Sequence, residues 1–334
     1  MYHMRIVAPP ERSEDALELL KTAPSVCNVI FLQGAAVEPE GDVILADVAR
    51  EDASVIISDL RELRLEEEGS IALESIDTAL SKHAERAEKA AKGAPSDAVI
   101  WEQVEFRTSE EAKLSASYLA FIVLATVLAA VGLLLNSPIL IVGAMVVGPE
   151  FGPIAGFCVA LVERQRKLAA RSFVALAVGF PAAITVTYLA ALGFKETGLA
   201  PGSFSFDDST FAHGIAHPDF FAFFVALGCG VAGMLSLTTA KSGALIGVLI
   251  SVATIPAASA MALAAAYRDG DAFAGSTAQL GLNLVTILFA GVATLSIQRR
   301  LYARRRKAHL TDDARRAAGL PLGRRSRPAE REPV

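Results

Sequence analysis

Residues 141–156 read IVGAMVVGPEFGPIAG, an apolar run that contains four glycines, two prolines and one glutamate. The run lies within a longer apolar stretch, residues 138–162. A helix that crosses a bilayer needs about 20 apolar residues, so this stretch is long enough. Prolines and glycines inside such a helix free backbone groups that lipid cannot satisfy. The stretch therefore predicts a broken helix in a membrane protein, where it is buried in protein or lines a cavity.

The whole chain has the composition of a membrane protein. Of its 334 residues 53% are hydrophobic, which leaves too few polar residues to cover the surface of a soluble domain. Six stretches are apolar and long enough to cross a bilayer. They are residues 115–135, 138–162, 168–193, 220–237, 243–267 and 275–298. We therefore expect a multi-pass α-helical membrane protein with six transmembrane helices.

Charge divides the chain into parts. Residues 1–107 hold 22 Asp and Glu against 11 Lys and Arg, whereas residues 299–334 hold 12 Lys and Arg against four Asp and Glu. We expect a cytosolic domain over 1–95, a linker over 96–114, the membrane domain over 115–298 and a basic, disordered cytosolic tail over 299–334. The tail should touch anionic lipid. Because the basic residues gather in this short segment, binding of nucleic acid is not expected.

The loops between the stretches predict the orientation. Basic residues fill 164–167 and 299–307, while the long loop 194–219 carries Glu196, Asp207 and Asp208. Positively charged loops stay in the cytoplasm. Both termini are therefore expected inside and the acidic loop outside.

The N-terminal part alternates between strand and helix patterns in the order strand, helix, strand, strand, helix, strand. That order is typical of a ferredoxin-like α+β sandwich. Ser13 is expected to cap the first helix. For Trp101 two placements are open: the headgroup level of the membrane, or a packed position on the soluble domain.

Six spans divide into three and three, and related halves with an odd number of spans must lie in opposite orientations. Residues 137–143 (SPILIVG) resemble residues 242–247 (SGALIG), and a proline follows in the same stretch each time. This weak similarity predicts a 3+3 inverted repeat, a plan found in transporters. A chance similarity between apolar segments is the alternative.

Glu150 stands twelve residues from either end of the second stretch. Placing a charge at the centre of a span costs about 2.5–3.5 kcal/mol for comparable residues on insertion scales. Three interpretations are open: a proton or cation site, a neutral carboxyl that donates a hydrogen bond, or a structural cap for the half-helix after Pro149. Thr254 near Pro256, and Asn283 in the sixth stretch, are candidate partners.

Other chemistry finds little support. His213, His217 and Asp219 have a spacing that a metal could use, but Gly214 and Pro218 argue against a helix there, so we predict a solvated loop and no metal. The three cysteines form no spaced framework. We find no metalloprotease motif, nucleophile elbow or phosphate-binding glycine loop, and expect neither an enzyme nor a cofactor.

The second stretch resembles a known family. The segments 136–138, 143–145, 148–149 and 152–154 are similar to domain of unknown function 389, as are 247–256 and 283–285. The resemblance covers about 115–298 and implies a multi-span protein of the bacterial cytoplasmic membrane, often with a soluble domain and without a settled activity. Many members carry an apolar residue where this chain has Glu150, which implies a role restricted to a subgroup.

Two functions remain. The first is a transporter or channel-like protein for a small solute or ion, gated by its cytosolic domain, with its site at broken second and fifth helices. The second is a membrane-anchored sensor whose N-terminal domain binds a ligand or partner. The bilayer is the expected partner, and the sequence also allows a homo-oligomer. The candidate site residues are Gly148, Pro149, Glu150, Gly152, Pro153, Thr254, Pro256 and Asn283.

Overall fold

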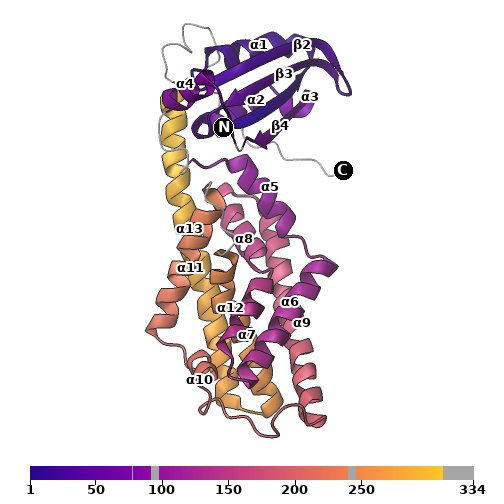
Figure 1. The fold of residues 1–334 in the computed structure, drawn as a ribbon, viewed down its shortest axis with the longest axis vertical. Coiled ribbons are helices and arrows are strands. Elements are labelled where there is room, and N and C mark those ends of the chain that lie inside the picture. The colour runs from indigo at the N-terminus through magenta and orange to yellow at the C-terminus, as the bar shows by residue number, and fades with distance from the viewer. Residues whose placement is uncertain (77, 92–97, 240–245, 311–334) are drawn as a thin grey trace. The chain divides into compact units, whose positions relative to one another are not determined.

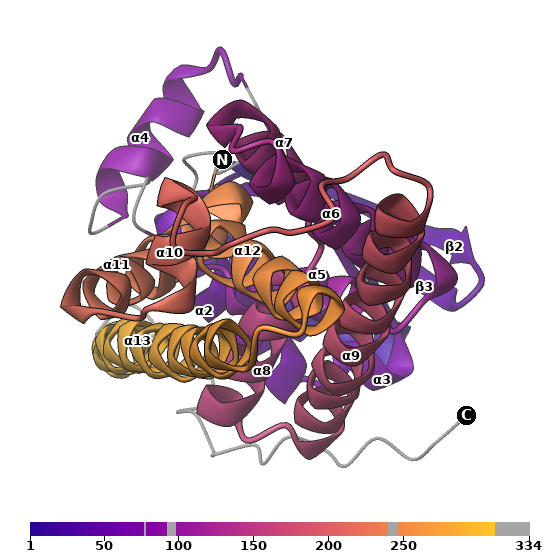
Figure 2. The same cartoon turned by 90° about the horizontal axis from the view of Figure 1, so that it is seen from below.

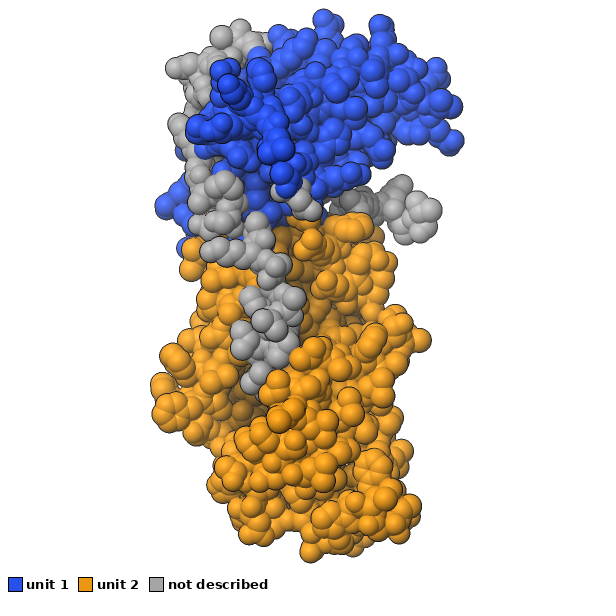
Figure 3. Space-filling view, in the orientation of Figure 1, with its two compact units in different colours: residues 1–102, 238–240, 300–334 blue, residues 103–237, 241–299 orange. Residues whose placement is uncertain are grey.

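The computed structural model describes residues 1–76, 78–91, 98–239 and 246–310 (Figure 1). The chain forms two compact units, which Figure 3 shows in different colours. We call residues 1–102, 238–240 and 300–334 the N-terminal unit, and residues 103–237 and 241–299 the helical unit. Each is described by itself.

The N-terminal unit contains a four-stranded antiparallel sheet in the order β2-β3-β1-β4. Its elements are β1 (Tyr2–Ala8), α1 (Pro10–Thr22), β2 (Val26–Val37), β3 (Glu40–Val48), α2 (Arg50–Glu62), α3 (Leu65–Glu68), β4 (Ser70–Ser75) and α4 (Lys82–Ala90). In β1 every second side chain is buried, among them Met4 and Ile6. These side chains share one apolar core with Leu20 of α1 and with Ile56 and Leu60 of α2. The period of two in the strand and the apolar face of each helix therefore meet in one core.

The predicted cap of the first helix needs correction, and the structure decides the placement of Trp101. Helix α1 begins at Pro10, not after Ser13, because a proline fits the first helical position, where no N–H partner is needed. Ser13 is buried inside the helix, and its hydroxyl donates to the carbonyl of Pro10 at 3.1 Å. Trp101 takes the second of the two placements considered: it is buried in the N-terminal unit, edge-to-face with Tyr302.

The expected disordered tail is helical over its first part. Helix α13 (Gly270–Leu310) continues well past residue 299. Tyr302 is 3.0 Å from the hydroxyl of Ser58 in α2, and Arg306 forms a 2.7 Å ion pair with Glu62. These contacts with α2 explain why the helix continues. The predictions for 311–334 lie outside the described residues.

The helical unit is built almost wholly from apolar helices. They are α5 (Trp101–Glu111), α6 (Ala116–Leu134), α7 (Pro138–Val147), α8 (Phe151–Glu163), α9 (Arg166–Glu196), α10 (Thr210–Ala216), α11 (Phe220–Thr238), α12 (Ile246–Tyr267) and α13. Within the described residues, α6, α9, α11 and α13 are each long and apolar enough to cross a membrane. If the bent pair α7–α8 is counted as one more span, there are up to five. Large apolar side chains point outward, for example Phe121, Phe173, Phe224 and Phe289. This is the surface of a unit that contacts lipid.

Helix α12 lies among the other helices of the unit, as the end-on view in Figure 2 shows. It contacts α6, α7, α8, α9 and α10. Almost every described residue from Thr254 to Ala264 is buried, and most are alanine or serine. Small residues let neighbouring helices approach closely, and burial on all sides marks a central helix.

Polar contacts mark the two ends of the helical unit. At one end, Arg299 of α13 forms a 2.8 Å ion pair with Glu163 at the end of α8. At the other end, Ser209 donates a 3.2 Å hydrogen bond to Asn136, which follows α6. We call these the Arg299 end and the Asn136 end.

Candidate functional site

The second apolar stretch is broken, as its sequence predicts. Helix α7 ends at Val147, α8 starts at Phe151, and the two are bent by 53°. Gly148 directly follows the last residue of α7 and has an extended ψ of 125°. Pro149 follows it, and the residue before a proline is disfavoured in the helical conformation. Gly148 and Pro149 therefore stop one helix and leave room for the next to begin.

Glu150 sits at this break, in the position before the first residue of α8, and has no exposed surface. Its side chain caps none of the N–H groups of α8, so the cap interpretation fails for the side chain. Instead, the hydroxyl of Thr254 on α12 donates a 2.9 Å hydrogen bond to Oε1 of Glu150. In the described part of the helical unit, Glu150 is the buried carboxylate. One of its two candidate partners is thus confirmed as a neighbour.

The predicted break in the fifth stretch is wrong. Helix α12 is continuous from Ile246 to Tyr267 and contains Pro256. A proline removes one hydrogen bond from a helix, and in a packed membrane helix neighbouring groups tolerate that loss. The Ser259 hydroxyl lies 2.8 Å from the carbonyl oxygen of Ile255 and 2.9 Å from that of Thr126 on α6, and its proton is shared between the two. This contact ties α12 to α6 close to the proline. Thr254 is therefore presented by an intact helix.

Asn283 lies on a buried polar face of α13. Ser276, Gln279, Asn283 and Thr286 are all buried and follow one another at spacings of three, four and three, which places them on one side of the helix. The neighbouring residue Leu284 packs against the cluster that contains Ile154 of α8 and against the cluster that contains Ile255 of α12. The turn of α13 that carries Asn283 therefore borders both elements of the Glu150 site.

Gly152 and Pro153 shape the first turn of α8. A Cβ atom at Gly152 would lie 2.5 Å from Cβ of Glu111, so glycine allows α5 to approach the start of α8. Pro153 falls in the first turn, where a helix N–H has no intrahelical partner and proline costs little. These two residues therefore set the packing around Glu150 and are not themselves ligands by their side chains.

Sequence reasoning missed Tyr118. This residue of α6 is buried, and its ring lies against Gly179 of α9, where an added Cβ would be 2.8 Å from the hydroxyl oxygen. The side chain of Tyr118 interacts electrostatically with the carboxylate of Glu150. Nothing in the sequence separates it from a tyrosine of the membrane interface, because both occur near the start of a span.

The arrangement suits binding of a cation or proton. A carboxylate, a hydroxyl and a phenol come from separate helices, and the adjoining ends of α7 and α8 present backbone groups that are not used inside either helix. Broken helices in transporters bind ions and substrates with such groups.

Comparison with known proteins agrees with the family resemblance. Residues 145–289 match the model of the Domain of unknown function (DUF389). An uncharacterized protein of Methanocaldococcus jannaschii is 25% identical over 158 residues, which is 47% of this chain and 47% of the relative, so the match spans about half of the relative's length. No solved structure matches the chain. The relative is archaeal, so the bacterial origin of this chain stays a prediction. Residues 145–289, somewhat less than half of the chain, are therefore similar to domain of unknown function 389, within the region where the sequence resemblance was expected.

Proposed function

We propose that this protein is a transporter or channel-like protein for a small solute or ion, and that Glu150 forms part of its binding site. The observation that carries the proposal is the fully buried Glu150 at a helix break, bonded by Thr254 from the central helix α12. A helix that only anchors a domain needs neither a break nor a buried carboxylate, and ionisable groups inside membranes are a default mark of function.

Six spans are part of this proposal, with α7–α8 counted as one and α12 as another. The ends of the elements support it. The pair α7–α8 leads from the Asn136 end to Glu163 at the Arg299 end, and α9 starts at once on the way back. Helix α12 closes at Tyr267, whose hydroxyl donates to the carbonyl of Pro201 in the α9–α10 loop at 2.7 Å. Helix α13 then returns to Arg299.

The 3+3 inverted repeat would pair the unit α6, α7–α8, α9 with α11, α12, α13. The middle element of each half supplies one partner of the Glu150–Thr254 bond, which fits a site at the interface of two halves. The continuous α12 against the broken α7–α8 is a difference between the halves that the repeat must accommodate.

The proposed orientation places both termini in the cytoplasm. Basic residues of the 164–171 segment and Arg299 lie at the Arg299 end, where Arg171 also bonds Ser109 of α5 at 3.3 Å. The loop at the Asn136 end carries Asp207 and Asp208. Single cysteines at Ser205 and at Ser326, in a chain without Cys27, Cys158 and Cys229, test this. An impermeant thiol reagent on intact cells should label position 205 and spare 326, and the reverse labelling would refute the orientation.

The N-terminal unit is proposed to be ferredoxin-like and to gate the membrane part. The order of elements, β1-α1-β2-β3-α2-β4 apart from the short α3, and the sheet order β2-β3-β1-β4 with all strands antiparallel, support this fold. The fold hosts many functions, so gating rests on the transport proposal and not on the sheet.

Glu150→Gln tests the proposal. Glutamine keeps the shape and can accept from Thr254, but it cannot carry a charge or exchange a proton. In proteoliposomes, screened with a pH-sensitive dye and with a potential-sensitive dye across a panel of cations and small solutes, the variant should lose at least tenfold of the flux. Its melting temperature should stay near that of the wild type.

Glu163→Gln is the matched control, because it makes the same change at the far end of α8. It should keep its flux. Unchanged flux in Glu150→Gln, with unchanged stability, would refute the role of Glu150 and leave the sensor as the better hypothesis. Loss of flux together with a large fall in melting temperature would indicate a structural role.

A sensor is the second candidate, and one feature of the N-terminal unit favours it. A hollow of about 670 Å³ is lined by five residues among others: Met1, Ile76, Leu80 and the charged Lys82 and Glu85. Ligand sites of small molecules have volumes of this order. A metabolite that raises the melting temperature of the full chain, and loses that effect when Leu80 is changed to Glu, would support this function.

A further inference from the structure

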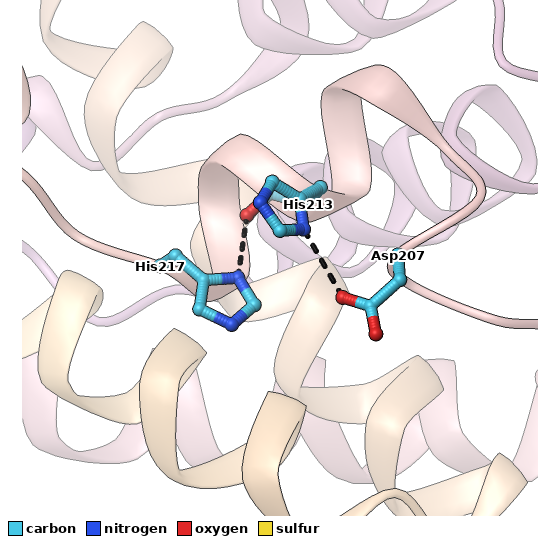
Figure 4. A group of neighbouring side chains, drawn as sticks. All are labelled: Asp207, His213 and His217. Carbon is cyan, nitrogen blue, oxygen red and sulfur yellow. Dashed lines mark hydrogen bonds and ion pairs between the residues drawn. The ribbon is translucent and has the colours of Figure 1, made fainter.

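We propose that Asp207, His213 and His217 form a binding site for a divalent transition-metal cation of the zinc type. One potential ligand atom from each of the three lies within 4.8 Å of the others. Figure 4 shows the imidazole of His213 on α10, the imidazole of His217 directly after α10, and the carboxylate of Asp207 on the segment before the helix. The proposal does not rest on transport.

From the sequence we expected no metal site here because we expected no helix, but the structure contains one. We expected no helix here because of Gly214 and Pro218, yet α10 is helical from Thr210 to Ala216. A glycine inside a helix costs only about 1 kcal/mol, and Pro218 comes after the helix has ended. His217 directly follows the last residue of α10, and its backbone N–H donates to the carbonyl of His213 at 3.1 Å, so the two residues lie one helical turn apart.

The helix is anchored so that this face stays open. Ser209 caps α10 by accepting from the N–H of Ala212 at 3.4 Å. Ala212 and Ala216 are buried in an apolar cluster with residues of α6, α7 and α12. The histidines follow these alanines by one position each and are exposed, as is Asp207. The backbone of the site is therefore held by the core, while its ligands face solvent.

The hydrogen bonds orient the imidazoles. Nδ1 of His217 is 3.0 Å from the carbonyl oxygen of His213, and a carbonyl can only accept, so this nitrogen carries the proton. The lone pair of His217 is therefore on Nε2, which is the arrangement of many metal-binding histidines. Nδ1 of His213 is 3.1 Å from Oδ1 of Asp207, and the two rings are stacked with centroids 4.3 Å apart. All three side chains are exposed, so each can rotate toward a shared ion.

The ligand set selects the class of metal. Two imidazoles and a carboxylate suit zinc and its neighbours in the first transition row, whereas calcium and magnesium prefer oxygen ligands alone. Three protein ligands also leave a coordination position for water, as in open zinc sites. Asp219, the acidic residue considered from the sequence, is not part of the group: its carboxylate accepts from the N–H of Ala222 at the start of α11 at 2.8 Å.

The test uses the full chain in detergent, without a polyhistidine tag and freed of metal with a chelator. Titration with zinc chloride by calorimetry should show a site that His217→Gln and Asp207→Asn each weaken at least tenfold. His83→Gln, a change of an exposed histidine in the N-terminal unit, should bind as the wild type does. Cobalt chloride should give a visible absorption band in the wild type that His217→Gln lacks.

The metal-free variants should melt at the wild-type temperature, because all three side chains are exposed. If His217→Gln does not fold, Asp207→Asn decides on the same two readouts. Equal zinc affinity and equal cobalt spectra in the wild type and the Asp207 and His217 variants would overturn the proposal.

Discussion

The hydroxyl of Thr254 is bonded to the carboxylate of Glu150 across 104 positions of sequence. Both residues are fully buried, one at the break between α7 and α8 and the other on the central helix α12. The bond therefore ties the irregular segment of the helical unit to its most buried regular helix. An acceptor in such surroundings depends on each donor, because no water replaces a lost one.

Thr254→Val removes the hydroxyl and keeps the shape of the side chain. We expect a loss of stability of about 1–3 kcal/mol, since a buried carboxylate oxygen loses a donor. Thermal melting of the purified protein measures the loss, and Thr254→Ser, which keeps a hydroxyl, should retain most of the stability.

A double-mutant cycle with Glu150→Leu, which removes the acceptor that glutamine would keep, gives the coupling between the two positions. Additive effects of the two single changes would contradict a direct interaction in the folded protein.

The packing of α11 against α13 depends on Gly230. A Cβ there would lie 2.7 Å from the carbonyl oxygen of Ile287 and as close to Cβ of Ala290. Gly230→Ala should therefore lower the melting temperature. Gly228→Ala, two residues away in the same helix, should not, because nothing lies within 4 Å of its added Cβ. Equal melting temperatures would mean that α11 and α13 do not pack in this way.

Asp42 makes the N-terminal unit sensitive to acid. The Ser13 side chain beside Asp42, and a 2.7 Å hydrogen bond from the N–H of Gly34, lower the pKa of Asp42. Gly34 has a φ of +59°, which glycine adopts freely, and the bond fixes this irregular point of β2. A lowered pKa stabilises the fold above the ordinary range of aspartate, and the contribution is lost as the pH falls through the lowered value.

Urea unfolding followed by the fluorescence of Trp101, the single tryptophan of the chain, measures this effect. The wild type should exceed Asp42→Asn in stability at pH 7, and the difference should shrink below about pH 4. Ser13→Ala should reduce the difference, because Ser13 makes the largest contribution to the lowered pKa. A difference that stays constant with pH would exclude this linkage.

That residues 1–95 fold alone stays a prediction, and the structure suggests a better boundary. Ile100 is buried in the core of the N-terminal unit, and Nε of Arg50 donates to the carbonyl of Ala98 at 3.1 Å. A fragment of residues 1–102 should therefore be more stable than 1–95 by about 2 kcal/mol, the value of burying one such side chain. Circular dichroism on heating compares them. Ile100→Ala in the longer fragment should remove most of the gain, and equal stability of both fragments would contradict it.

The sequence was informative where a local rule forces a local structure. Gly148 and Pro149 predicted the break, and the short apolar run from Met4 to Ala8 predicted a strand, in which the structure buries Met4 and Ile6. It also suggested Thr254 as a partner of Glu150, since a buried carboxylate needs a donor.

Prediction from the sequence failed where packing against distant residues determines the local structure. Pro256 was expected to break α12, but a helix surrounded by other helices tolerates the proline. Gly214 was expected to prevent a helix, but Ala212 and Ala216 are anchored in a core formed by distant residues. Tyr118 became part of the site only through the fold, because its position opposite Gly179 depends on how α6 and α9 pack.

The break between α7 and α8 also has a consequence for how the chain is made. The 10 residues of α7 and the 13 of α8 extend for about 15 and 20 Å, each short of the roughly 30 Å of hydrocarbon that a span must cross. Neither helix is therefore long enough to cross the hydrocarbon by itself. Thr254, which bonds Glu150 at their junction, is synthesised 104 residues after Glu150. During synthesis, the Glu150 carboxylate therefore lacks its Thr254 donor until α12 has been made.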